Sequence, residues 1–289
     1  MKISAVPELL RIHNAIFGSL TILISGFLFT RDPWILGWGV LAYVALASAG
    51  NVINDIYDIE VDKINKPHRP LPSGAISLKE AKIIYVILVA IGLGASIVSS
   101  ILVKNPLPFI IAAIFAGIGV LYSARLKILG FIGNITVGCS FSIGYIYGWI
   151  ITGMVMNLPR IITILLFFTV STTLLVAREI IKGIEDIRGD ALRNVRTLAR
   201  TKGVPFASKV AAIFLILAIV SFTALPFIKV ISPIFIPFMI AGDIAAFSSL
   251  VYTLKGEAGA SRASFYAKAG AFIGLVGFLV GVIPVPIYE

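Results

Sequence analysis

Long apolar stretches are the feature that most limits how this chain can fold. A segment of roughly 17 to 25 apolar residues can cross the hydrocarbon core of a bilayer as a helix. Hydrophobic residues make up 58% of the chain and charged residues 13%, against about 25% charged in soluble domains. About nine such windows can be placed, near residues 11–30, 34–56, 80–102, 107–123, 131–153, 159–182, 206–227, 231–253 and 265–286. The sequence therefore predicts an all-α, polytopic membrane bundle, with residues 1–289 forming a single domain.

The basic residues predict the orientation of this bundle. The chain has 24 lysines and arginines. If the N-terminus is cytoplasmic, only Arg31, Lys104, Arg160 and Lys229 fall on the opposite side. This asymmetry follows the positive-inside rule and predicts a multi-pass protein of the cell membrane with a cytoplasmic N-terminus. Topology and contact with anionic lipid headgroups explain the net charge of +10, so we expect no nucleic-acid partner.

Two acidic clusters lie at the predicted cytoplasmic ends of the windows 34–56 and 159–182 or in the loops that follow. The first contains Asn54, Asp58 and Asp62, and the second contains Asp186 and Asp190. Residues four apart lie one turn apart on one face of a helix. An ionisable side chain costs about 2.5 to 3.5 kcal/mol at the centre of a membrane helix. The placement of both clusters therefore indicates a functional site.

Two basic residues precede the second cluster on the same helical face. Arg178, Lys182, Asp186 and Asp190 follow one another in steps of four. Salt bridges of about 0.2 to 0.5 kcal/mol each could explain one such series, but two matched clusters on one predicted membrane side favour a shared function. Carboxylate and amide oxygens select Mg²⁺ or Mn²⁺, and Mg²⁺ commonly bridges to substrate phosphates. Metal ions with nearby cations neutralise a diphosphate leaving group, while apolar helices would exclude water. The residues predict ionisation of a lipid diphosphate, with Mg²⁺ as the cofactor.

The first cluster and the loop that follows it resemble the first signature of the UbiA superfamily of intramembrane prenyltransferases. That loop reads Asn65-Lys66-Pro67-His68-Arg69-Pro70-Leu71-Pro72-Ser73-Gly74. The stretch from Arg178 to Asp190 is similar to the second signature. Both are closest to the archaeal branch that makes ether lipids. The resemblance implies helices around a central cavity with a cytoplasmic opening, and Mg²⁺-dependent transfer from geranylgeranyl diphosphate to geranylgeranylglyceryl phosphate.

The resemblance also implies roles for individual residues. Asn54, Asp58 and Asp62 would bind one Mg²⁺, and Asp186 with Asp190 would bind the other. The four carboxylates and Lys182 would be catalytic. The expected substrate contacts, to phosphates for most of them, are Arg11, Asn14, Asn54, Arg69, Tyr122, Lys127, Tyr145 and Arg178.

Several of these residues have a simpler interpretation. Tyr122 and Lys127 fit an interfacial tyrosine with a snorkelling cation as well as a diphosphate contact. Tyr145 is either an interhelical hydrogen-bonding residue or part of the cavity wall. Asp243, a lone acid inside a predicted helix, either has a polar partner or lines the cavity. Gly183 departs from the family pattern, which commonly has another aspartate there.

Two other functions fit the pattern. A prenyltransferase with an aromatic acceptor, making a quinone or haem precursor, would use the same two acidic motifs. A cation transporter would also carry intramembrane carboxylates, but near the bilayer midplane and in internal repeats. Here the clusters lie at one predicted interface and are accompanied by cations, which favours the enzyme. The oligomeric state is left open.

Overall fold

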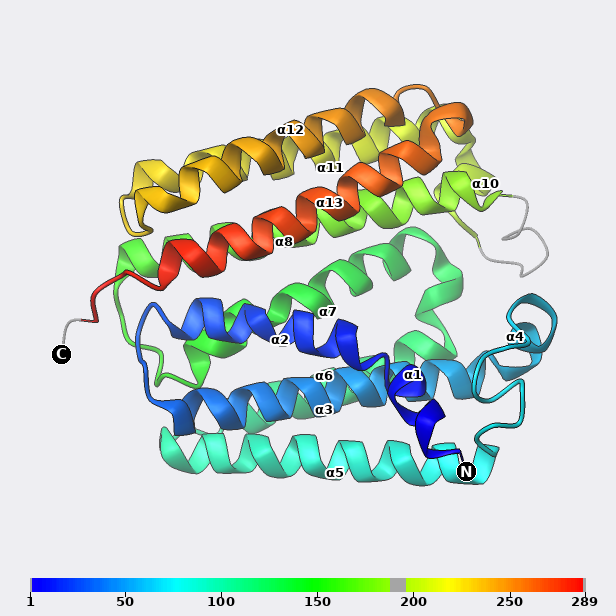
Figure 1. The fold of residues 1–289 in the computed structure, drawn as a ribbon, viewed down its shortest axis with the longest axis horizontal. Coiled ribbons are helices and arrows are strands. Elements are labelled where there is room, and N and C mark those ends of the chain that lie inside the picture. The colour runs from blue at the N-terminus through cyan, green and yellow to red at the C-terminus, as the bar shows by residue number, and fades with distance from the viewer. Residues whose placement is uncertain (1, 188–195, 288–289) are drawn as a thin grey trace. The chain divides into compact units, whose positions relative to one another are not determined.

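The computed structural model describes residues 2–187 and 196–287. Within these residues every regular element is a helix, which confirms the all-α class. Each predicted apolar window coincides with one helix (Figure 1). These helices are α2 (Ile12–Gly26), α3 (Pro33–Tyr57), α5 (Leu78–Leu102), α6 (Leu107–Ala124), α7 (Phe131–Ile150), α8 (Leu158–Glu185), α11 (Val204–Ala224), α12 (Ile236–Thr253) and α13 (Glu257–Val282). The shorter elements are η1 (Ile3–Ala5), α1 (Val6–Leu10), α4 (Ile59–Asn65), η2 (Leu126–Leu129), α10 (Leu198–Lys202), η3 (Leu225–Ile228) and η4 (Pro233–Phe235).

The predicted number of membrane spans is approximate. Among the described residues, seven helices are long and apolar enough to cross a membrane. An eighth is formed if the bent pair Ile3–Leu10 and Ile12–Gly26 acts as one span. The two parts of this pair meet at an angle of 46°, because Arg11 between them adopts a left-handed backbone conformation with φ 46°. Helix α7 occupies its predicted window without being one of the seven.

The chain divides into two compact units, and the first consists of residues 1–26, 31–125 and 147–154. Helix α3 is its centre and packs against α2, α5 and α6. Small residues allow this close packing: a β-carbon at Gly92 of α5 would lie 2.6 Å from a Leu46 side-chain atom of α3. At one end of α3, a buried cluster joins Leu9 of α1 to Val52 and to Leu71 in the loop after α4. This cluster holds the N-terminal segment and that loop against the same end of α3.

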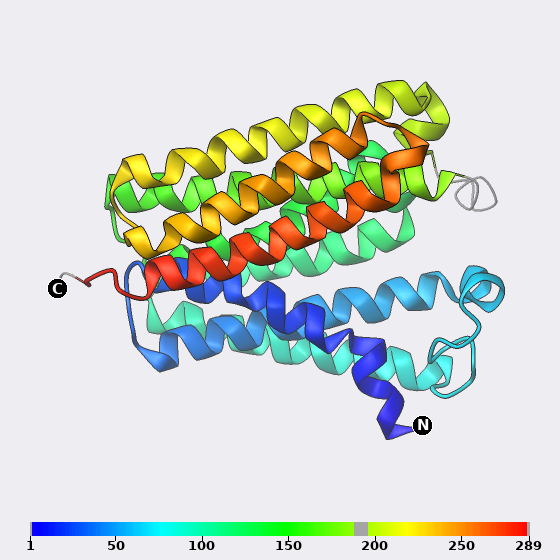
Figure 2. The same cartoon turned by 45° about the horizontal axis from the view of Figure 1, so that its top comes forward.

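The second unit consists of residues 27–30, 126–146 and 155–289. Helices α8, α11, α12 and α13 form a four-helix group in which each helix packs on two others (Figures 1 and 2). Alanines at the contacts, among them Ala177, Ala211 and Ala263, let the helix backbones approach closely. Further along the group, the rings of Phe167 and Phe278 pack at a tilt of 37°, with centroids 4.2 Å apart. The single domain expected from the sequence stays a prediction.

The two helices that carry the acidic motifs start at defined caps. The side chain of Asp32 accepts a hydrogen bond of 2.8 Å from the backbone N–H of Trp34 at the start of α3. Asn157 does the same for Arg160 at the start of α8, at 3.2 Å. Such caps satisfy backbone donors that have no partner within the helix. Both helices then end inside an acidic motif, at Tyr57 and Glu185.

Candidate active site

The first acidic motif spans a break between α3 and α4. Asp58 lies at this break with φ −93° and ψ 0°. Helical hydrogen bonding nevertheless continues through it, because the N–H of Asp58 donates to the carbonyl of Asn54 (3.0 Å) and that of Asp62 to the carbonyl of Asp58 (2.8 Å). Asn54, Asp58 and Asp62 therefore follow one another at one-turn spacing despite the break. This is the spacing on which the predicted oxygen site depends.

Two arginines lie against the carboxylates of this motif. Nη1 of Arg69 is 2.6 Å from Oδ2 of Asp62 and 3.4 Å from Oδ1 of Asp55. Nη2 of Arg11 is 2.5 Å from the same Oδ1 of Asp55. Both aspartates are buried. We call Arg11, Asp55, Arg69 and Asp62 the arginine–aspartate cluster. It places two predicted phosphate ligands, Arg11 and Arg69, next to a predicted metal ligand.

The loop after α4 holds Arg69 in place. The backbone N–H of Arg69 donates to the carbonyl of Lys66, and the N–H of Ser73 donates to the carbonyl of Arg69, both at 3.0 Å. Leu71 and Ile76 of the same loop are buried against α1 and α3. This apolar anchoring explains how an irregular loop can carry an arginine into a defined position beside α3.

Arg11 reaches the cluster because α1 and α2 break at that residue. The amide of Asn51 on α3 donates to the carbonyl of Leu10 (3.0 Å), the residue before the break. Asn14, the other predicted acceptor ligand of this segment, is exposed on α2. The structure thus joins the Arg11 side chain to the motif through Asp55, whereas the Asn14 side chain is exposed.

Asp55 belongs to the first acidic motif, but the sequence assigned it no role. It lies beside the face that carries Asn54, Asp58 and Asp62, yet its carboxylate contacts both arginines. A signal was present in the sequence, because Asp55 follows Asn51 by four residues and so lies on the same face of α3. Only the partners, which come from distant segments, distinguish Asp55 from an ordinary helix-end acid.

The second motif begins on the last turns of α8, an amphipathic helix. Ile180, Ile181 and Ile184 are buried in the core of the four-helix group. Lys182 and Asp186 are exposed, and the N–H of Asp186 donates to the carbonyl of Lys182 at 2.9 Å. The apolar face thus fixes the helix while the predicted catalytic groups stay accessible. Asp190, the second predicted carboxylate of this motif, lies outside the described residues.

Arg178 has a donor available for a ligand. Its Nη1 pairs with Oε1 of Glu179 at 2.8 Å. Its Nε is buried and has no hydrogen-bond partner among the described residues. Buried donors are normally satisfied, so one that is not requires an explanation. An anionic substrate group at Arg178, as expected from the sequence, would provide it.

Packing explains why residue 183 is a glycine. A β-carbon there would lie 3.2 Å from Cβ and 3.3 Å from Cγ2 of Thr197. Thr197 is itself buried and caps α10 by accepting a hydrogen bond from the N–H of Arg200. An aspartate at position 183 would have to displace this threonine. The segment that returns after the second motif therefore occupies the space that a larger side chain would need.

The remaining predicted substrate residues differ in their surroundings. Tyr122 on α6 and Lys127 in η2 are half-buried. Tyr145 is completely buried, its hydroxyl lies 3.1 Å from Oγ of Ser171, and its ring packs against Phe167. This interior position favours the interhelical hydrogen bond for Tyr145 over a place in a cavity wall.

The side chains of the first motif fit a magnesium ion. Among the described residues, no three or more His, Cys, Asp or Glu side chains gather as a metal site. The motif instead offers the amide of Asn54 with the carboxylates of Asp58 and Asp62. Mg²⁺ is commonly bound by one or two carboxylates, with waters and substrate phosphates as its other ligands. The donor set is therefore suitable for a metal ion that is shared with a phosphate substrate.

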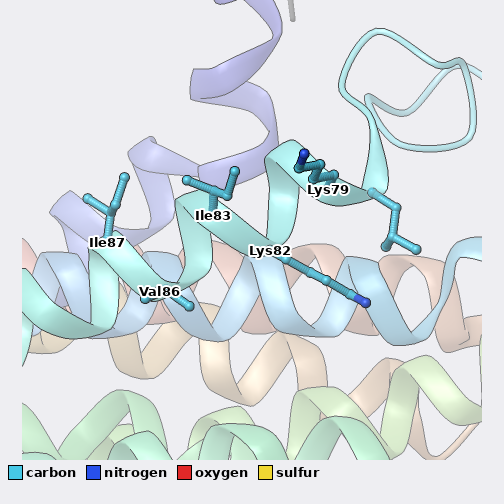
Figure 3. Close-up of a pocket in the computed structure, with 6 residues that line it drawn as sticks. Lys79, Lys82, Ile83, Val86 and Ile87 are labelled. Carbon is cyan, nitrogen blue, oxygen red and sulfur yellow. The ribbon is translucent and has the colours of Figure 1, made fainter.

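A separate groove lies on the outer face of α5. It has a volume of about 660 Å³ and is lined by Leu78, Lys79, Lys82, Ile83, Val86 and Ile87. Figure 3 shows these side chains along one helix. None of the predicted site residues lines it, so this groove does not belong to the candidate site.

Comparisons with known proteins match this chain to one family. The profile of the UbiA prenyltransferase family matches residues 15–280. Digeranylgeranylglyceryl phosphate synthase of Saccharolobus solfataricus is 37% identical over 291 residues, which covers 98% of this chain and 99% of the relative. The enzyme of the same name from Metallosphaera sedula is 35% identical over 286 residues, covering 96% of this chain and 95% of the relative.

Solved structures share the fold. A structure described as giving insights into digeranylgeranylglyceryl phosphate synthase in membranes has a TM-score of 0.80 and 30% identity, covering 98% of this chain and 99% of the other. A UbiA homolog from Archaeoglobus fulgidus, solved with DMAPP and Mg²⁺, has a TM-score of 0.69 and 18% identity. It covers 98% of this chain and 100% of the other, and supports the fold alone.

Proposed function

The chain belongs to the UbiA prenyltransferase family and is a multi-pass membrane prenyltransferase, and from this premise we propose that it is a digeranylgeranylglyceryl phosphate synthase. It would transfer a geranylgeranyl group from geranylgeranyl diphosphate to the free hydroxyl of geranylgeranylglyceryl phosphate. The resemblance to the ether-lipid branch, deduced from the two motifs, is confirmed by the names of the relatives. The substrates follow from those names, and the cytoplasmic N-terminus stays a prediction.

The observation that carries this proposal is the first acidic motif with Arg11 and Arg69 beside it. Asn54, Asp58 and Asp62 would hold one Mg²⁺, and Asp186 with Asp190 the other. Bound Mg²⁺ would supply positive charge that stabilises the departing diphosphate. Arg178, whose buried Nε has no hydrogen-bond partner in the described part of the chain, would donate to a phosphate oxygen. Lys182, exposed one turn before Asp186, would add a mobile cation.

A phosphate-bearing acceptor needs cations beyond those that hold the donor. The arginine–aspartate cluster supplies two guanidinium groups, and guanidinium binds phosphate oxygens in a bidentate manner. An aromatic acceptor would not require a second phosphate site. The cluster therefore favours the glyceryl phosphate over the aromatic acceptor, which remains the second candidate within the family.

The test is a transfer assay with the purified protein in detergent. Radiolabelled geranylgeranyl diphosphate would be offered with geranylgeranylglyceryl phosphate or with 4-hydroxybenzoate, each with and without Mg²⁺ and with an EDTA control. We expect a product from the glyceryl phosphate only, and only with Mg²⁺. A product from 4-hydroxybenzoate alone would keep the prenyltransferase and overturn the acceptor. Activity in EDTA equal to that in Mg²⁺ would overturn the metal requirement.

A further inference from the structure

One carboxylate oxygen joins two arginines that are far apart in the sequence. Oδ1 of Asp55 accepts from Nη2 of Arg11 at 2.5 Å and lies 3.4 Å from Nη1 of Arg69. Arg11 comes from the break between α1 and α2, and Arg69 from the loop after α4. The carboxylate of Asp55 thus links the N-terminal segment to this loop by pairing with one arginine from each.

The backbone at Arg11 is strained to make this contact. Its φ of 46° and ψ of 48° are left-handed, a conformation that side chains with a β-carbon rarely adopt. Two residues of α3 hold it there: Asn51 binds the carbonyl of Leu10, and Asp55 binds the guanidinium of Arg11. Strain that is maintained by specific contacts commonly marks a functional position.

The burial of the three groups is unequal. The side chain of Asp55 is 5% exposed, whereas those of Arg11 and Arg69 are 30% and 20% exposed. The carboxylate is therefore enclosed, while both arginine side chains are partly exposed. Each guanidinium has five N–H donors, and the bonds to Asp55 and Asp62 occupy only some of them. Donors thus remain on both arginines for a ligand that approaches from outside.

We propose that Asp55 is a positioning residue that holds Arg11 and Arg69 together as a binding site for the phosphate group of a prenylated lipid substrate. Two guanidinium groups repel one another, and a buried carboxylate bound to both offsets this repulsion without occupying all of their donors. A phosphate, which has several acceptor oxygens and carries negative charge, matches such a pair. This inference rests on the proposed function for the identity of the lipid, because both the diphosphate donor and the phosphate acceptor carry the group.

The test is a binding measurement in detergent without turnover. The probes are geranylgeranyl diphosphate, geranylgeranylglyceryl phosphate and the neutral geranylgeranylglycerol, each titrated without the second substrate and without Mg²⁺. Asp55→Asn keeps the shape of the side chain and removes its charge. We expect it to weaken binding of a phosphate-bearing probe by on the order of tenfold, the value of one charge-assisted hydrogen bond. Binding of the neutral lipid should be unchanged. The probe that is affected identifies the source of the phosphate.

One variant serves as a matched control, and a second as a substitute for Asp55→Asn. Glu60→Gln also removes one carboxylate, but from an exposed pair with Lys63, and should leave all three affinities unchanged. If Asp55→Asn does not fold, Arg11→Gln tests the same pair at a more exposed side chain, with the same expected result.

The outcomes separate this inference from the proposed function. If Asp55→Asn binds all three probes as the wild type does, or weakens the neutral lipid equally, the positioning role is refuted even if the wild type transfers prenyl groups. If Asp55→Asn selectively weakens the diphosphate while the wild type makes no product from the glyceryl phosphate, the positioning role holds and the proposed acceptor is wrong.

Discussion

Replacing Gly130 by alanine should detach the segment that returns from the second acidic motif. Gly130 has φ 61°, and a β-carbon there would lie 1.8 Å from the carbonyl oxygen of Arg196. No rotation of a side chain can relieve an overlap with the backbone. The N–H of Arg196 also donates to the carbonyl of Ile128 at 3.2 Å, so the displaced segment would lose this bond. Thr197, which packs on Gly183 and caps α10, is the next residue.

The expected cost has two parts. A β-carbon in the left-handed region costs about 1 to 2 kcal/mol, and loss of one backbone hydrogen bond costs about 0.5 to 1.5 kcal/mol. We therefore expect Gly130→Ala to lower the free energy of unfolding by roughly 1.5 to 3.5 kcal/mol. Prenyl transfer should fall as well, because Arg196 and Thr197 follow the second motif directly.

Gly153 provides a matched control. Its φ is 82°, and a β-carbon there would meet nothing within 4 Å. Gly153→Ala should therefore lose stability only because a β-carbon is unfavourable in the left-handed region. Both variants also reduce the entropy of the unfolded chain, so this effect cancels in the comparison. Unfolding would be followed in detergent by circular dichroism, and transfer by product formation. If the two variants have equal stability and activity, the close approach of Gly130 to Arg196 does not contribute, and the reasoning is refuted.

Three further predictions concern single side chains. Asp58→Ala should abolish transfer, while circular dichroism and membrane extraction should show a folded, membrane-inserted protein. Full Mg²⁺-dependent activity in this variant would contradict the role of Asp58 as a metal ligand. Tyr145→Phe loses the hydroxyl contact with Ser171 and should cost about 1 kcal/mol of stability with KM values unchanged, whereas a raised substrate KM would make Tyr145 a wall group. Thr223→Val removes the hydrogen bond of 2.9 Å to Asp243 and should cost about 0.6 kcal/mol, the average for interhelical bonds in membranes; a much larger loss of thermal stability would indicate that Asp243 depends on Thr223 alone.

The sequence by itself determined the class of fold and the positions of the helices. Apolar windows long enough to span a bilayer leave few alternatives to helices, because backbone groups in lipid must be satisfied within the segment. The spacing of Asn54, Asp58 and Asp62 likewise predicted one face of a helix, since it depends only on the helical repeat. A local departure, the bend at Arg11, depends on contacts with Asn51 and Asp55 that no window of residues around position 11 contains.

Tertiary structure decided how the charged groups pair. The sequence assigned Asp55 no role, and it became a candidate only because folding brings Arg11 and Arg69 to one of its oxygens. Gly183 departs from the family pattern, and only the structure shows the reason, which is that Thr197 packs against it. Tyr145 was equally compatible with two roles until its hydroxyl was found beside Ser171. Helix periodicity is a local property of the chain, whereas ion pairs, steric limits and burial depend on residues that only the fold makes neighbours.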